Sequence, residues 1–298
     1  MTDNFQQVPT DPKRVVGRLA PTPSGYLHLG NAVNFVLTWL LVRRAGGTLH
    51  LRIDDLDRAR LRRPYLENIF RVIDWLGINY DLGPSGPDDF LRHYSQLLHL
   101  PDYNRVLRRL AQQPGLVYAT RRSRTSPAEP VPLDTPGAAW RMHVPPTVLA
   151  AAPKVPGASP VPLAELMPDF VVRKKDGVAA YQLASVVDDL RLGTTLVVRG
   201  QDLQPSTAAQ LWLAAKVSET QGFTADRIQF CHHALLTDAT GHKLSKSTQA
   251  QGDGGVLALG SPAAVYRAVA QVLGLPIEAG ESLTTLREVV SKKGPLLE

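Results

Sequence analysis

The hydrophobic pattern in the amino-terminal part of the chain alternates short apolar runs with longer helical ones. Residues 14–20 and 48–54 have the length and apolar character of buried strands. Between them, residues 30–45 are almost continuously apolar, which predicts a buried helix that ends at Gly46. A second helix is predicted where apolar residues recur at helical spacing, at Leu66, Ile69, Phe70, Ile73 and Leu76. Strand, helix, strand and helix in this order indicate a parallel sheet covered by helices.

A proline-rich stretch interrupts this pattern in the middle of the chain. An amphipathic helix is expected over residues 102–113, but ten prolines then fall within the 36 residues from Pro127 to Pro162. Proline fixes φ and removes a backbone donor, so no long regular element is expected there. Regular patterns resume afterwards, with strands over residues 169–174 and 194–200 and helices over residues 181–190 and 203–218.

The end of the chain has the pattern of a small helical tail. A glycine-rich link at residues 251–255 precedes it, and Ser261 followed by Pro262 is typical of a helix start. We therefore predict an α/β fold, a doubly wound, Rossmann-like parallel-sheet domain that is split by an irregular insertion and followed by a short helical tail. The predicted parts are 14–118 for the first half of the domain, 119–167 for the proline-rich insertion, 168–250 for the second half, and 251–298 for the link and tail.

Composition and charge narrow the class of protein only a little. Lys and Arg number 33 against 27 Asp and Glu, and the net charge of +6 is compatible with a polyanionic partner. Cys231 is the single cysteine, which excludes a disulfide within the chain and a zinc site of several thiolates. The longest apolar stretch, residues 32–42, is too short to span a bilayer, and the first residues lack a signal-peptide pattern. We expect a cytoplasmic protein.

Residues 17–31, GRLAPTPSGYLHLGN, lie between the first predicted strand and the first predicted helix. In an open α/β sheet, ligands bind outside the carboxyl ends of the strands, where helix N-termini favour anions. His28 and Gly30 therefore stand where a nucleotide can approach the start of the helix. Alone, this His-x-Gly spacing is more typical of an ordinary turn with a surface histidine.

A second constellation, GHKLSKS at residues 241–247, follows much later in the chain. Lys243 and Lys246 make this segment strongly cationic, which alone is more typical of a solvated loop than of a phosphate clamp. Together, and in this order on an α/β background, the two constellations resemble the HIGH and KMSKS signatures of class I aminoacyl-tRNA synthetases.

Four other segments narrow the resemblance to the glutamyl-tRNA synthetases. RLAPTPSG at residues 18–25 is similar to their opening motif, and RIDDLD at residues 52–57 is similar to their R-I-E-D-T-D strand end. YQLA at residues 181–184 and VRGQDL at residues 198–203 are similar to the second half of the same catalytic domain. The stretch after Ser247 is too short for the large anticodon-binding region of a full synthetase. The chain therefore most resembles the short paralogues, the glutamyl-Q tRNA(Asp) synthetases, which attach glutamate to queuosine at the wobble position of tRNA(Asp).

This resemblance implies that the chain activates L-glutamate with ATP, accompanied by Mg²⁺, to give glutamyl-adenylate and pyrophosphate. Charge develops on phosphoryl oxygens in such a step, so catalysis depends on positioned donors and cations. By the resemblance, His28, Lys243 and Lys246 are the catalytic residues, and Gly30 joins them in binding ATP. The implied partner is tRNA(Asp) that carries queuosine, bound by a monomer.

The resemblance also implies a glutamate pocket. Arg18 and Arg199 are the expected carboxylate partners, because a guanidinium group forms bidentate hydrogen bonds. Asp54 stands where the family usually has a glutamate that reads the substrate ammonium, so its carboxylate is drawn back by about one methylene. The expected glutamate-binding residues are Arg18, Ala20, Thr22, Asp54, Tyr181 and Arg199.

Members of the short-paralogue family commonly hold zinc in the insertion with three cysteines and a tyrosine. Here Tyr118-Ala119-Thr120-Arg121 stands where the family pattern is Tyr-Cys-Thr-Cys. We therefore expect no zinc, and an insertion that proline rigidity holds in place of the metal.

Other polar groups have plainer interpretations. Asp188-Asp189 has the pattern of a polar helix end and receives no catalytic role, and His232-His233 is expected to be a strand end rather than a metal site. The basic insertion fits either a solvated face or a phosphate-contacting surface. Its cationic residues include Arg121, Arg122, Arg124, Arg141 and Lys154.

Two other functions fit the same sequence. A truncated glutamyl-tRNA synthetase would charge the 3′ end of tRNA(Glu), although the missing anticodon-binding region argues against it. A non-catalytic, synthetase-like RNA-binding protein would tolerate Asp54 and the altered insertion. Retention of the expected arginines, His28, Tyr181 and both loop lysines favours the active enzyme.

Overall fold

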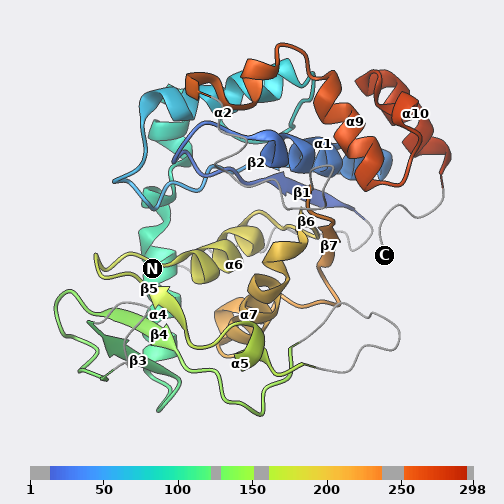
Figure 1. Cartoon of the computed structure of the whole chain (residues 1–298). Helices are drawn as coiled ribbons and strands as arrows, with labels where there is room; N and C mark the ends of the chain where they lie inside the picture. Colours follow the sequence, from blue (N-terminus) through green and yellow to red (C-terminus); the bar gives the residue numbers. More distant parts are fainter. Residues whose placement is uncertain (1–13, 122–128, 151–160, 237–251, 294–298) are drawn as a thin grey trace. The chain divides into compact units, whose positions relative to one another are not determined.

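The computed structural model divides into two compact units, each described by itself (Figure 1). The residues that it describes are 14–121, 129–150, 161–236 and 252–293. Of these, the first unit, called the parallel-sheet unit, comprises residues 14–96, 194–202, 231–236 and 252–293. The second, called the insertion unit, comprises residues 97–121, 129–150, 161–193 and 203–230. The domain boundaries expected from the sequence stay a prediction. They were drawn where the composition changes, whereas the two units are groups of residues in contact.

The parallel-sheet unit confirms the predicted α/β class. Its elements are β1 Val16–Leu19, α1 Leu29–Arg44, β2 Thr48–Leu51, α2 Arg63–Trp75, α3 Pro87–Asp89, β6 Leu196–Gly200, β7 Gln229–His233, α9 Ala263–Val272 and α10 Leu283–Lys292. The sheet has the order β2-β1-β6-β7, and β1 pairs in parallel with both β2 and β6. Parallel neighbours need a crossover connection, which α1 provides between β1 and β2.

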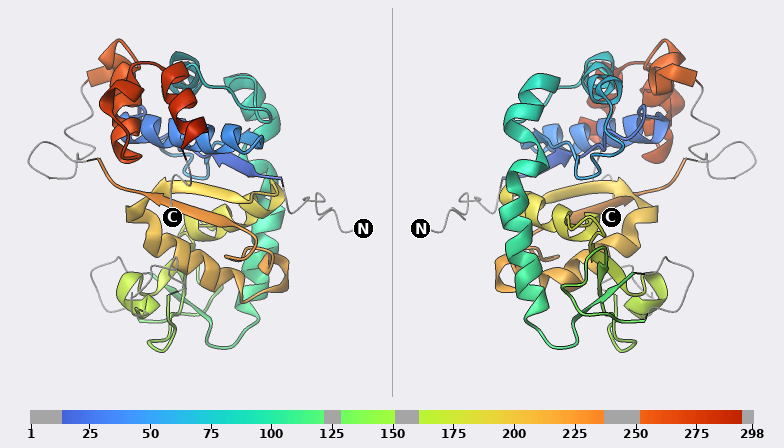
Figure 2. Two further views of the ribbon diagram at one scale, coloured as in Figure 1. Left: turned by 90° about the vertical axis from the view of Figure 1, so that its right-hand side faces the viewer. Right: turned by 90° about the vertical axis from the view of Figure 1, so that its left-hand side faces the viewer.

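Helix α1 is buried on almost all sides because it lies between the sheet and the carboxyl-terminal helices. It contacts β1, β2 and β6, and it also contacts α9 and α10, which lie beside it in both views of Figure 2. A helix that is apolar all round must be covered all round, which explains the continuous apolar pattern of residues 30–45. The tail helices supply this cover with Val265, Val269, Leu286 and Val290, all buried in the same core.

The start of the tail helix falls one residue later than predicted. Helix α9 begins at Ala263, so Pro262 rather than Ser261 is the N-cap residue and no side chain caps the helix. The hydroxyl oxygen of Ser261 accepts a hydrogen bond from the Ala263 amide at 3.3 Å in the turn that precedes it. Among the described residues, no helix has the length and apolar character needed to cross a membrane.

The insertion unit combines helices with a small antiparallel sheet. Its elements are α4 Leu100–Ala111, β3 Val117–Thr120, β4 Ala139–Met142, α5 Leu163–Leu166, β5 Phe170–Arg173, α6 Tyr181–Arg191 and α7 Gln204–Ala214. The sheet has the order β3-β4-β5, with Tyr118 opposite Arg141 and Trp140 opposite Arg173. Each strand has only four residues, and β4, the strand within the proline-rich stretch, agrees with the expectation that the prolines prevent long regular elements.

Candidate active site

The turn after β1 lies beside the loop after β2. The amide of Asp54 donates to the carbonyl of Pro21 at 2.9 Å, which extends the β1–β2 pairing beyond the strand ends. Ala20, half-buried, and Thr22, exposed, flank that proline. Two segments of the predicted glutamate pocket therefore meet at the carboxyl end of the parallel strands, where ligands bind in open α/β sheets.

The two predicted carboxylate partners, Arg18 and Arg199, lie on neighbouring strands of this unit. Arg18 lies in β1, and Arg199 lies near the end of β6. Their exposed fractions are 6% and 4%. Gly17 of β1 is paired with Leu196 of β6. If this parallel register is continued for three residues along both strands, Arg199 lies opposite Ala20, two residues after Arg18. The strand order thus brings together two arginines that the sequence separates widely.

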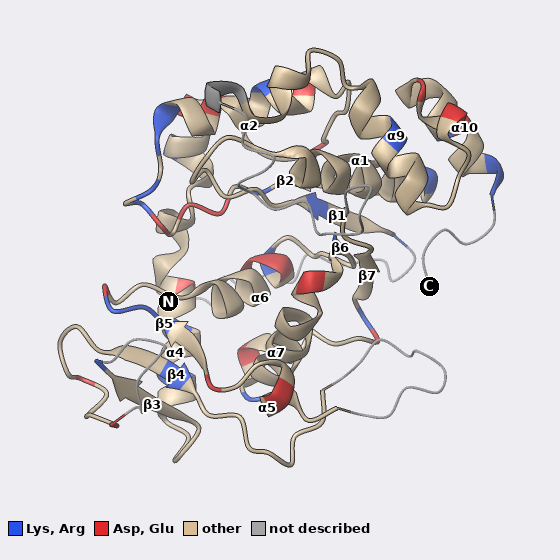
Figure 3. Ribbon diagram, in the orientation of Figure 1, with Lys and Arg blue, Asp and Glu red and all other residues tan. Residues whose placement is uncertain are grey.

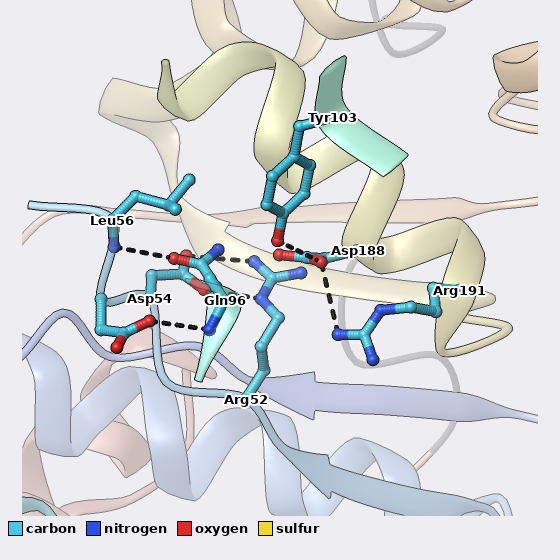
Figure 4. Close-up of polar contacts among 8 residues, drawn as sticks. Arg52, Asp54, Leu56, Gln96, Tyr103, Asp188 and Arg191 are labelled. Carbon is cyan, nitrogen blue, oxygen red and sulfur yellow. Dashed lines mark hydrogen bonds and ion pairs between the residues drawn. The ribbon is translucent and has the colours of Figure 1, made fainter. Parts of the chain in front are cut away.

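Asp54 forms a bidentate ion pair with Arg52, two residues before it (Figure 4). The Nε–Oδ1 distance is 2.7 Å and the Nη2–Oδ2 distance is 3.2 Å. Both side chains are largely buried, with exposed fractions of 5% for Arg52 and 13% for Asp54. A substrate ammonium that binds Asp54 must therefore share its carboxylate with a guanidinium group. The role of Asp54 in reading the ammonium stays a prediction.

A buried carboxylate beside Asp54 holds the loop after β2 in place. Asp55 is 1% exposed and accepts hydrogen bonds from the Ser95 hydroxyl at 2.7 Å and the Gln96 amide at 2.8 Å. Arg58 also lies 2.7 Å from this carboxylate. In return, the side-chain oxygen of Gln96 accepts from the Leu56 amide at 3.1 Å (Figure 4). The sequence analysis missed this reciprocal clasp, because no local pattern connects segments forty residues apart.

His28 occupies the position directly before α1. Its amide donates to the side-chain oxygen of Asn31 at 3.1 Å, and its carbonyl accepts from the Asn31 amide at 3.0 Å. The imidazole lies over Gly30, since a Cβ at residue 30 would be 3.2 Å from the His28 ring atoms Cε1 and Nδ1. The glycine of this motif therefore leaves room for the histidine ring at the helix N-terminus.

The residue before His28 is anchored from two sides. The Leu27 amide donates to the side-chain oxygen of Asn68 at 2.9 Å, and Asn68 is buried in α2. The Leu27 carbonyl accepts from the Val256 amide at 2.7 Å. Gly255 precedes that contact with a φ of +56°, and a Cβ there would approach the Leu27 carbonyl oxygen to 2.4 Å. Only glycine fits so close to this turn.

Lys243 and Lys246 lie outside the described residues, so their role as catalytic and ATP-binding residues stays a prediction. The described chain stops three residues after β7 and resumes at Gly252. Because Val256 then contacts Leu27, the chain that follows the second signature returns to the neighbour of His28.

His232 and His233 end β7, as the sequence predicts. Burial, together with the nearby Arg199 and His233, lowers the pKa of His232 to about 4. Burial also lowers the pKa of His233, against the opposing effects of the Ala234 carbonyl and of Asp202. Both imidazoles are therefore mainly uncharged at neutral pH, and the positive charge beside them is that of Arg199.

The helix α6 in the insertion unit carries Tyr181 at its first residue, with 46% of the side chain exposed. The interpretation of Asp188-Asp189 as an exposed polar helix end is wrong, because their exposed fractions are 0% and 1%. The Tyr103 hydroxyl from α4 donates to Asp188 at 2.8 Å, and Arg191 lies 3.3 Å from the same oxygen (Figure 4). Packing of α4 against this face buries the pair.

The insertion does not fit the zinc site of the short paralogues. Burial and the nearby Asp169 carboxylate raise the pKa of Tyr118 to about 12, which disfavours the phenolate form. Ala119 is a buried strand residue where the family pattern has a thiolate. Within the described ranges, no three His, Cys, Asp or Glu side chains gather as a metal site would require.

These features match a known family. The catalytic domain of the class I tRNA synthetases (E and Q) matches residues 14–123 and 154–296. The chain therefore belongs to this family, and it is a ligase of the class I aminoacyl-tRNA synthetase type. This confirms the resemblance inferred from the motifs.

Individual relatives agree with this assignment. The chain is 38% identical over 261 residues to the glutamyl-Q tRNA(Asp) synthetase of Nitratidesulfovibrio vulgaris (strain Hildenborough). The aligned region covers 78% of this chain and 78% of that protein. It is 35% identical over 297 residues to glutamate–tRNA ligase 2 of Xanthobacter autotrophicus, covering 94% of this chain and 63% of the ligase. The fold resembles the crystal structure of glutamate–tRNA synthetase from Elizabethkingia anophelis, with a TM-score of 0.71, 22% identity, and coverage of 95% and 66%. The chain thus spans about two thirds of the length of the last two proteins.

Proposed function

We propose that this chain activates L-glutamate with ATP and transfers the glutamyl group to queuosine at the wobble position of tRNA(Asp). The observation that carries the proposal is the convergence of Arg18, Arg199 and Asp54 at one end of the parallel strands. This end supplies cations for carboxylates and a carboxylate for an ammonium, which is the charge pattern of glutamate. The name and similar length of the Nitratidesulfovibrio relative support queuosine as the acceptor.

In the first step, an oxygen of the α-carboxylate attacks the α-phosphorus of ATP. A carbon–oxygen–phosphorus linkage forms while the bond from that phosphorus to its bridging oxygen breaks, and pyrophosphate leaves. His28, at the N-terminus of α1, stands where helix amides and an imidazole can stabilise charge on phosphoryl oxygens. Lys243 and Lys246 are proposed to neutralise the same charge. Mg²⁺ is proposed to arrive on the ATP phosphates, with water as its other ligand.

In the second step, a nucleophile of the acceptor attacks the acyl carbon of glutamyl-adenylate. The bond from that carbon to the phosphate oxygen breaks, and AMP leaves. Arg18 and Arg199 are proposed to hold the two carboxylates of glutamate before activation, because a guanidinium group recognises a carboxylate through two parallel hydrogen bonds. In the adenylate only the side-chain carboxylate keeps such a partner. Asp54, with Ala20, Thr22 and Tyr181, is proposed to complete the pocket.

The basic side chains of the insertion sheet support an RNA partner. The Cζ atom of Arg173 lies 4.9 Å from the centre of the Trp140 ring, and Lys175 donates to the carbonyl of Arg121 at 2.7 Å. Because β4 lies between β3 and β5, Lys175 reaches across the sheet. These contacts hold the cations through an aromatic ring and a carbonyl rather than a carboxylate, so their charge is available to phosphates. Figure 3 shows basic positions in β4 and directly after β5.

The deciding experiment follows labelled glutamate, with ATP, into three RNAs: tRNA(Asp) with queuosine, tRNA(Asp) without it, and tRNA(Glu). The proposal expects label only in tRNA(Asp) that carries queuosine. Label in tRNA(Asp) lacking queuosine would refute the proposed acceptor. Exchange of labelled pyrophosphate into ATP, measured with glutamate and then with aspartate, tests the activation step separately and expects exchange with glutamate alone.

A second candidate is charging of the 3′ end of tRNA(Glu). The similarity to glutamate–tRNA ligase 2, over 94% of this chain, is the observation that favours it. Labelling of tRNA(Glu) in the same experiment would establish this function instead.

A further inference from the structure

Every backbone polar group of Leu27 and His28 has a hydrogen-bond partner. The Leu27 amide donates to Oδ1 of Asn68 at 2.9 Å, and the Leu27 carbonyl accepts from the Val256 amide at 2.7 Å. The His28 amide donates to Oδ1 of Asn31 at 3.1 Å, and the His28 carbonyl accepts from the Asn31 amide at 3.0 Å. Asn31 is local, whereas Asn68 and Val256 come from α2 and from the chain before α9.

The peptide group between Leu27 and His28 is held on both of its edges. Its atoms lie in one plane, because the carbon–nitrogen bond has partial double-bond character. The carbonyl on one edge is bonded to Val256, and the amide on the other edge is bonded to Asn31. These two bonds restrict rotation of the plane, so they restrict the direction in which the His28 side chain leaves the backbone.

Helix α2 supports the preceding residues from a single face. Asn68 is 2% exposed and accepts from the Leu27 amide, and Leu27 itself is 3% exposed. Tyr65, three residues before Asn68 and therefore on the same face of the helix, packs edge-on against Tyr26 with the ring centroids 5.0 Å apart. A buried amide requires an acceptor, so the Leu27 amide explains a polar residue at position 68.

Gly255 allows the chain before α9 to approach the same peptide group. Its φ is +56°, and a Cβ there would lie 2.4 Å from the Leu27 carbonyl oxygen and 2.8 Å from Cβ of Tyr26. Val256, the next residue, is 2% exposed and donates its amide to that carbonyl. Only a residue without a Cβ brings the Val256 amide this close.

We propose that Asn68 and Gly255 are positioning residues for His28. They act on the backbone of Leu27, and the peptide group that follows it sets the place of the imidazole over Gly30. The inference rests on the proposed function, in which this imidazole stabilises charge on the phosphoryl oxygens of ATP. A displaced ring loses a contact that strengthens in the transition state, so the rate falls more than substrate binding does.

The first test removes the acceptor of the Leu27 amide. Asn68→Leu keeps a side chain of similar size, and it should lower the kcat of glutamate-dependent pyrophosphate exchange about tenfold while the KM for glutamate stays within about twofold. Asn68→Asp keeps an acceptor oxygen whether or not its carboxyl is protonated, so it should retain kcat within about threefold of wild type. Equal losses of kcat in Asn68→Leu and Asn68→Asp would overturn the inference.

Tyr266→Phe is the matched control for lost stability. The Tyr266 hydroxyl donates to the carbonyl of Leu76 at 3.0 Å, which is another buried bond from a side chain to the backbone at the far end of α2. Tyr266→Phe and Asn68→Leu should both lower the melting temperature by a few degrees, but only Asn68→Leu should slow the exchange. If Tyr266→Phe slows it equally, lost stability explains the result and the inference fails.

The second test presses on the Leu27 carbonyl through Gly255→Ala. Gly274→Ala is its control, because Gly274 has a φ of +59° and a Cβ there meets no atom within 4 Å. Both variants strain the backbone alike, but only the methyl group at residue 255 reaches Leu27. The kcat of exchange should fall about tenfold in Gly255→Ala and stay within about twofold of wild type in Gly274→Ala. Equal rates in the two variants would contradict the proposal.

A double-mutant cycle determines whether Asn68 acts through His28. His28→Gln removes the imidazole, so the addition of Asn68→Leu to this variant should lower kcat little further. If the two losses simply multiply, Asn68 affects the rate by another route and the inference is wrong.

The imidazole signal of His28 tests the inference without activity. Its carbon–proton resonance is assigned as the one that His28→Gln removes. The resonance should move in Asn68→Leu and Gly255→Ala and stay in place in Tyr266→Phe and Gly274→Ala. If the wild-type protein exchanges no pyrophosphate with glutamate, the proposed function fails, and this comparison alone decides the inference. A resonance that stays in place in all four variants would overturn it.

Discussion

The clasp around Asp55 provides a quantitative test of how the loop beside the glutamate pocket is held. Asp55→Asn keeps the shape of the side chain, but the amide has one acceptor oxygen where the buried carboxylate has two. Of the two buried donors that now share Asp55, the Ser95 hydroxyl and the Gln96 amide, one then faces an NH₂ group. A buried donor without an acceptor costs about 1–3 kcal/mol.

The Arg58 ion pair adds little to this estimate. The Arg58 side chain is 42% exposed, so solvent screens its charge and we take its contribution as less than about 1 kcal/mol. We therefore expect Asp55→Asn to lower the free energy of unfolding by about 2–3 kcal/mol, measured by urea denaturation with the slope unchanged. Because the clasp borders Asp54, the KM for glutamate should rise more than the KM for ATP in pyrophosphate exchange.

Asp57→Asn in the same loop is the matched control. Asp57 pairs with Arg60, and their side chains are 42% and 63% exposed, so this substitution should change stability by less than about 0.5 kcal/mol. If Asp55→Asn and Asp57→Asn prove equally mild, or if Asp55→Asn raises both KM values alike, the reasoning about the clasp is refuted.

Three further predictions test the site. Gly30→Ala sets a methyl group 3.2 Å from the His28 ring, so pyrophosphate exchange should slow about tenfold while the melting temperature stays equal or rises; unchanged exchange would contradict the proposed ring placement. Burial lowers the pKa of His232 to about 4, from about 6.5 in the unfolded chain, so the unfolded protein binds this proton at a higher pH than the folded protein. The stability contribution is therefore complete above about pH 6.5, and the free energy of unfolding falls by about 2–3 kcal/mol as the pH is lowered towards 4. His232→Gln should flatten this decline when the free energy is measured by urea denaturation at each pH. Arg173→Gln should weaken tRNA binding in a filter-binding titration, and it should reduce the slope of log K against log salt concentration by about one. Lys216→Gln, which removes the cation over the Trp212 ring, is the control and should change neither the affinity nor the slope.

The local patterns of the sequence were sufficient for the main elements of the parallel-sheet unit. The apolar run at residues 30–45 became α1, and the periodic residues from Leu66 to Leu76 became α2 with its end. The motif residues Arg18, His28 and Arg199 were identified because their motifs resemble those of the class I synthetases, and their roles stay predictions. These features depend on neighbours in the chain, which is why the sequence shows them.

The tertiary structure decided the partners of buried polar groups. Adjacent Asp188 and Asp189 look like a solvated helix end, and only the packing of α4 shows that Tyr103 reaches Asp188. Asn68 interrupts the apolar face of α2 for the same kind of reason, since it accepts from the distant Leu27 amide. A polar residue at a buried position cannot be interpreted until its hydrogen-bond partner is known.

The sequence by itself therefore determined the α/β class, the strands and helices of the core, and the two signature motifs that define the family. The tertiary structure decided which side chains hold the segments of the site in position: the Asp55–Gln96 clasp, the Asn68 anchor and the Arg52–Asp54 pair. Periodicity and residue type specify how each segment exposes its apolar face, and this information is local. Burial removes water from polar groups and obliges each to find a partner, and that partner is set by the fold rather than by the distance along the chain.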